Sequence, residues 1–100
     1  MTSKNNLYSL LVKMEDAAEH KDRDQVVRIN KEFSPMYFNI FREVPYEEGS
    51  MKMLFDRARN KFVFAVQEHD PEYIEECEEE RKESLKEGRE LIKKIKKKLD

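Results

Sequence analysis

The chain has 100 residues, of which 38% are hydrophobic and 42% charged, and its formal net charge is −2. A chain of this length is expected to form one domain, and it is too short for a doubly wound sheet or a large cofactor fold. With only 2 Gly and 3 Pro, it has too little turn material for an all-β fold, so a few long helices with short connections are expected.

The apolar residues exclude two further classes. No run of about 18 apolar residues is present, so no membrane span is expected. Leu10–Val12 is too short for the apolar core of a secretory signal, and Cys77, the only cysteine, cannot form an internal disulfide. These features are compatible with a reducing compartment, and we expect the protein to be cytoplasmic.

Apolar residues spaced three and four apart predict a first helix over about residues 6–20. Asn5 or Asn6 is its expected N-cap, and residues 1–6 are expected to be frayed. His20 and Lys21 supply cations at its C-terminal end, where the helix dipole favours positive charge.

A second helix is predicted over about residues 23–43, with Asp22 or Asp24 as its N-cap. Pro35 interrupts its apolar pattern, so we expect a kink near residues 33–35, unless Ser34 recaps the chain and Pro35 begins a new helical segment.

The stretch from Val44 to Gly49 has the composition of a loop, after which Ser50 can cap a third helix over about residues 50–68. Asp70 and Pro71 then indicate a stop and a new helix that continues almost to the end of the chain.

The last helix has an asymmetric charge distribution. Residues 72–83 contain seven Glu, whereas residues 86–98 contain seven Lys and Arg. Acid first and base last is the order that the helix dipole favours. At about 1.5 Å per residue, such a helix extends about 42 Å, so part of it is expected to project beyond the bundle or lie across it.

Signals for catalysis or metal binding are weak. His20 and His69 belong to no metal-binding spacing, and the carboxylates around Cys77 disfavour its reactive thiolate. The glutamate run lacks the loop pattern of a calcium site, and the two glycines form no phosphate-binding loop. We therefore expect no enzyme activity, no metal and no cofactor.

Aromatic and Met residues are more numerous in the second and third helices than one core face can accommodate. Core packing explains most of them, and the surplus indicates an apolar groove that binds a helix of another protein. The candidate groove residues lie off the main core stripes and are Met36, Phe38, Met53 and Phe64.

The last helix also carries an apolar seam with the spacing of a coiled coil, formed by Leu85, Ile92, Ile95 and Leu99. The same spacing traced backwards meets Arg81 and Glu78, so only the C-terminal half can pack on apolar surface. That half is expected to cover the groove on the second and third helices. A chain ending near Glu83 is therefore expected to remain helical and to bind its partner more tightly.

The segment Ala17–Phe33 reads AAEHKDRDQVVRINKEF and resembles the first helical hairpin of FliT-like flagellar export chaperones. The resemblance covers about residues 7–41, and Lys21 stands where a Gly is common in that family. It implies a cytoplasmic helical bundle that shields an aggregation-prone export substrate, with its last helix able to occupy the binding groove.

The expected architecture is an all-α antiparallel bundle of three helices over residues 1–70, with a long charged fourth helix over residues 71–100 of the same domain. The expected function is a non-enzymatic protein-binding module, namely a chaperone, adaptor or inhibitor that holds a partner helix.

Two alternative functions remain open. One is a structural homo-oligomer, for instance a weak homodimer, assembled through the seam. The other is a regulator that contacts nucleic acid through Lys93–Lys98, against which the net charge and the glutamate run argue.

Overall fold

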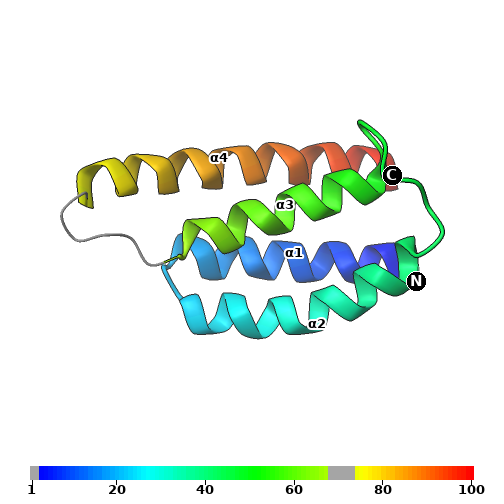
Figure 1. Cartoon of the computed structure of the whole chain (residues 1–100), viewed down its shortest axis with the longest axis horizontal. Helices are drawn as coiled ribbons and strands as arrows, with labels where there is room; N and C mark the ends of the chain where they lie inside the picture. The colour runs from blue at the N-terminus through cyan, green and yellow to red at the C-terminus, as the bar shows by residue number, and fades with distance from the viewer. Residues whose placement is uncertain (1–2, 68–73) are drawn as a thin grey trace.

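The computed structural model describes residues 3–67 and 74–100, and in this part of the chain all regular secondary structure is helical. The helices are α1 (Ser3–Glu19), α2 (Arg23–Phe41), α3 (Met51–Ala65) and α4 (Ile74–Leu99). Successive helices run in opposite directions along the long axis (Figure 1). The predicted all-α antiparallel bundle with a long fourth helix is therefore confirmed.

The helices α1 and α3 form the centre of the bundle, and α2 and α4 lie on opposite sides of them (Figure 1). Within the described residues, α4 packs on α3 and α1 and does not contact α2. The expectation that the last helix covers the second helix is therefore wrong. An apolar stripe shows that a helix has a face to bury, but it does not identify the neighbour that covers it.

One contiguous core fills the space between the helices. Its largest fully buried side chains come from the first three helices and from Ile95 of α4. A chain of aromatic rings connects α2 to α3, with centroid distances of 5.7 Å from Phe33 to Tyr37, 5.2 Å from Tyr37 to Phe41 and 5.6 Å from Phe41 to Phe55. Such ring pairs add stabilisation beyond the area they bury.

Local sequence signals explain where two of the helices begin. The Asp22 carboxylate accepts a hydrogen bond from the Gln25 backbone N–H, and the Ser50 hydroxyl accepts one from that of Met53, each at 3.2 Å. Both caps are as predicted. The prediction for α1 is wrong, because this helix begins at Ser3 and Asn5 and Asn6 lie inside it.

The helix α2 continues through Pro35 and changes direction in its C-terminal half (Figure 1). An interior proline removes one hydrogen bond and crowds the preceding turn, which accounts for the bend. The Ser34 hydroxyl donates to the Asn30 carbonyl at 3.0 Å, so Ser34 does not recap the chain.

One part of the long helix α4 projects beyond the bundle, and the other part packs on it. Its N-terminal turns extend past the ends of the other three helices, while the remainder lies along α3 (Figure 1). The predicted start of this helix, at Asp70 and Pro71, lies outside the described residues. None of the helices that the structure describes is long and apolar enough to cross a membrane.

Candidate functional site

The apolar seam of α4 is used inside the chain. Leu85, Ile92 and Ile95 are buried, and Leu99 packs at the edge of the core. These side chains complete the core between α1 and α3. A homo-oligomer assembled through the seam would first have to pull α4 away from its own bundle, so the seam is not an exposed interface.

Gly88 lies in the middle of this seam, where α4 approaches α3 closely. A Cβ atom at Gly88 would lie 2.6 Å from Cε1 and 2.8 Å from Cζ of Phe62, whose side chain is fully buried. Only glycine leaves room for the ring there. One turn earlier, the Ser84 hydroxyl donates to the Lys61 carbonyl at 2.7 Å, which adds a polar tie between the two helices.

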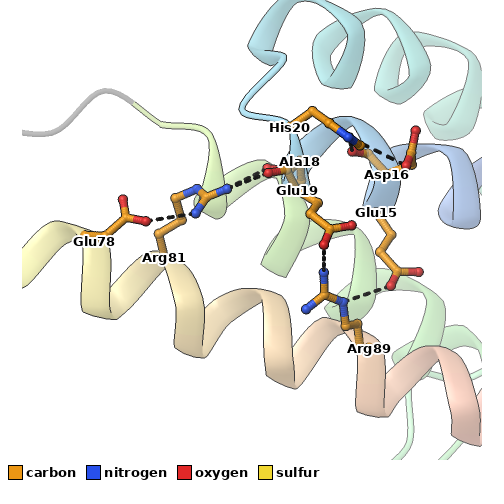
Figure 2. A network of polar contacts seen from close by, with 8 residues as sticks. All are labelled: Glu15, Asp16, Ala18, Glu19, His20, Glu78, Arg81 and Arg89. Atoms are coloured by element: carbon orange, nitrogen blue, oxygen red, sulfur yellow. Dashed lines mark hydrogen bonds and ion pairs between the residues drawn. The ribbon is translucent and has the colours of Figure 1, made fainter.

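Two arginines of α4 attach it to α1 (Figure 2). Arg81 is 9% exposed, and its Nη2 donates to the carbonyl oxygens of Ala18 at 3.2 Å and Glu19 at 2.9 Å. These carbonyls lie at the end of α1, where the negative end of the helix dipole favours a cation. Arg89 reaches Glu15 at 3.0 Å and Glu19 at 3.3 Å. The spacing of the seam predicted that Arg81 lies in line with the apolar residues of α4, but it did not predict the contact with the end of α1.

His20 lies beside this contact, at the end of α1 (Figure 2). Its Nδ1 donates to the Asp16 carbonyl at 2.8 Å. That hydrogen bond, together with the Asp16 carboxylate, raises the pKa of His20. The predicted role as a helix-end cation is consistent with this geometry.

Three adjoining hollows lie along the α3–α4 pair. They have volumes of about 420, 500 and 440 Å³. The first and second share Asn60, Lys61 and Glu87, and the second and third share Arg57, Leu91 and Lys94. The shared residues place the three hollows next to one another along the helix pair, and the ion-paired Lys61 and Glu87 line both the first and the second. We call this row of hollows the α3–α4 groove.

The two ends of the α3–α4 groove carry opposite charge. Glu80, Glu83 and Glu87 line one end together with Phe64. At the other end, Arg57, Lys94, Lys97 and Lys98 surround a floor that includes Met53, Leu54 and Leu91. Antiparallel packing explains this order, because the acidic half of α4 lies beside the end of α3 and the basic half beside its start.

The four predicted groove residues do not share one surface. Met53 is 4% exposed and belongs to the core at the basic end of the α3–α4 groove, whereas Phe64 is 39% exposed at its acidic end. Met36 and Phe38 belong to α2, which does not contact α4. Met36 packs against the core and Phe38 is 63% exposed. The prediction that Met53 lies off the core is therefore wrong, and periodicity does not show on which side of the bundle the other three residues lie.

Sequence reasoning missed Arg57, Asn60 and Leu91 as groove residues. Arg57 and Asn60 are polar residues one helical turn apart on α3, which makes them neighbours on its surface. Leu91 precedes the seam residue Ile92 and is half-buried. Positions that flank an apolar stripe in this way are the signal that could have identified them.

Across residues 3–67 and 74–100, no group of three or more His, Cys, Asp and Glu side chains is placed to hold a metal ion. Comparisons with protein-family models, with curated proteins and with solved structures find no match to this chain.

Proposed function

We propose that this chain is a non-enzymatic protein-binding module and that the α3–α4 groove receives a helical segment of another protein. The observation that carries this proposal is the row of three adjoining hollows along α3 and α4. From Glu80 to Lys98, the α4 wall extends about 27 Å at 1.5 Å per residue, enough to hold about five turns of helix.

The composition of the groove supports a helix as its occupant. Phe64 and Leu91 supply apolar surface at successive points, and charged side chains flank them. An amphipathic helix binds such a surface with one apolar stripe, leaving its polar faces to contact the charged rim.

The attachment of α4 supports a preformed site. Arg81 and Arg89 tie this wall to α1, and Ser84 ties it to α3. A preformed groove avoids the entropic cost of ordering a binding surface. Chaperone, adaptor and inhibitor are three roles that share this activity. The proposed compartment is the cytoplasm, with which Cys77 in its thiol form is compatible.

Site-specific photo-crosslinking in the native host tests the proposal. The photoreactive residue p-benzoylphenylalanine replaces Phe64 in the groove or, as a control, Val27 on the outer face of α2. The two native side chains are similarly exposed, at 39% and 43%. We expect position 64 to label a helical segment of another protein and position 27 not to label it. Equal labelling from both positions, or none from position 64, would contradict the proposal.

A further inference from the structure

The charges at the two ends of the α3–α4 groove are largely uncompensated. Glu87 pairs with Lys61, and Arg57 lies 3.6 Å from Glu48. By contrast, Glu80 and Glu83 at the acidic end, and Lys94, Lys97 and Lys98 at the basic end, form no ion pair with any other described residue. A ligand can therefore meet these charges without breaking an internal contact.

The order of these charges limits how a helix can lie in the groove. Along α4, the acidic end comes first and the basic end last. A helix with glutamates in its first half and lysines or arginines in its second half is complementary only when it runs antiparallel to α4. In the parallel orientation, both ends would place like charges together, which opposes binding. Acid first and base last is also the order that stabilises a helix before it binds.

We propose that the occupant is an amphipathic helix of another protein with an acidic N-terminal half and a basic C-terminal half, bound antiparallel to α4. This inference rests on the proposed function and names the chemistry of its partner.

A second folded copy of this chain fits the charges but not the floor of the groove. The α4 helix has the required charge order, but its apolar seam residues Leu85, Ile92 and Ile95 are buried in its own bundle. The exposed residues of α4 that the structure describes are all Glu and Lys. The α4 helix of a second copy would therefore present no apolar stripe to Phe64 and Leu91.

Two synthetic peptides of identical composition and about 20 residues provide the test. Both carry a Leu and Ala stripe at spacings of three and four. The acid-first peptide has its glutamates in the first half and its lysines in the second, whereas in the other peptide glutamates and lysines alternate along the chain. Each is titrated calorimetrically into the full chain at about 50 mM salt. We expect the acid-first peptide to bind at least tenfold more tightly. We also expect this ratio to shrink towards one as salt is raised, because ions screen exposed charges.

Charge reversal in α4 locates the effect. The double variant Glu80→Lys, Glu83→Lys should lose about tenfold in affinity for the acid-first peptide. The control Glu76→Lys, Glu79→Lys makes the same change of net charge in the same half of α4, at exposed residues that do not line the groove. It should keep its affinity within about twofold. Circular dichroism confirms that both variants are folded.

Several results would overturn the inference. Equal binding of the two peptides would show that the arrangement of charges along the partner helix does not affect binding. The proposed function would still be tested separately by the cross-link at position 64. Equal losses in the two double variants would show a net-charge effect outside the groove. Absence of binding by both peptides at millimolar concentration would exclude this class of helix, and the cross-link would then decide the function alone.

Two further measurements compare other occupants. Self-association in sedimentation velocity that Glu80→Lys, Glu83→Lys abolishes would identify a second copy as the occupant and overturn the inference. An oligonucleotide that binds more tightly than the acid-first peptide at about 150 mM salt would assign the basic end to nucleic acid, with the same consequence.

Discussion

Lys21 adopts a left-handed backbone conformation, with φ of 59°, at the end of α1. The Asp22 N–H donates to the Ala17 carbonyl at 2.9 Å, and the Lys21 N–H donates to the Ala18 carbonyl at 3.1 Å. These two bonds form the Schellman motif that commonly ends a helix, in which the residue after the cap is usually glycine. The side chain of Lys21 therefore makes this turn less favourable than a glycine would.

Replacing Lys21 by Gly is expected to raise the free energy of unfolding by about 0.5–1 kcal/mol, because glycine adopts positive φ without the steric cost of a Cβ. The change removes an exposed 3.6 Å ion pair with Glu78, which contributes little. Lys21→Ala removes the same ion pair but keeps Cβ, and it serves as the control in urea denaturation. The explanation is wrong if the glycine variant is no more stable than the alanine variant.

Tyr37 links the pH dependence of stability to the contact between α2 and α3. Its hydroxyl donates to the Lys52 carbonyl at 2.9 Å. Burial, with a smaller contribution from the Asp56 carboxylate, raises the pKa of Tyr37 to about 12. Its pKa in the unfolded chain is near 10. Between these values, the folded state holds more protons than the unfolded state, so the free energy of unfolding must fall as pH rises.

Tyr37→Phe should reduce this fall between pH 10 and 12. At pH 7 it should cost about 1 kcal/mol, because the hydrogen bond to Lys52 is lost. Tyr8→Phe, in another partly buried ring, is the control for removing a phenol hydroxyl. Urea denaturation at several pH values measures both effects. A Tyr37→Phe variant with the same slope as the unmodified chain would show that Tyr37 is not the group responsible.

At the scale of the helices, Arg81 fixes the position of α4 against the end of α1. Arg81→Met keeps an apolar stem of similar length but removes the donors to Ala18, Glu19 and Glu78. We expect a loss of about 2–3 kcal/mol, as is usual for hydrogen bonds made by a charged group. Lys82→Met is the control, because Lys82 is the next residue along α4 and is exposed. Equal thermal unfolding of the two variants would contradict a capping role for Arg81.

The sequence predicts features set by neighbouring residues better than contacts between distant ones. The Asp22 and Ser50 caps and the bend at Pro35 depend on residues within one turn, and all three are observed. The choice of α1 and α3 as neighbours of α4 depends on how the whole bundle closes. For the same reason, the sequence did not show that Met53 is buried in the core while Phe64 is exposed at the acidic end of the groove.

For the whole molecule, the packing of α4 changes the expected effect of truncation. A chain ending at Glu83 loses Leu85, Ile92 and Ile95, which are buried here. Their burial contributes about 5–9 kcal/mol in total, before entropy is subtracted, at about 1.5–3 kcal/mol for each side chain. Since a domain is stable by only about 5–15 kcal/mol, we now expect this truncated chain to lose cooperative unfolding rather than to bind more tightly.

Thermal melts followed by circular dichroism, together with binding of a hydrophobic dye, measure this effect. A chain ending at Ile95 is the matched control, because it keeps all three side chains and should still unfold cooperatively. A cooperative transition in the chain ending at Glu83 would show that the first three helices form a stable unit by themselves.

The close approach of Gly88 to Phe62 also prevents α4 from sliding along α3. If α4 moved by one turn in either direction, Ser84 or Ile92 would take the position of Gly88 opposite Phe62. The side chain of either residue would then clash with the Phe62 ring. The helix therefore has a single longitudinal register, set at its middle rather than by the length of the segment that connects it to α3. Insertion or deletion of a residue between α3 and α4 should then leave Glu80 and Lys98 at the same positions along the groove. The spacing of the charges that a partner meets is protected from changes in that connection.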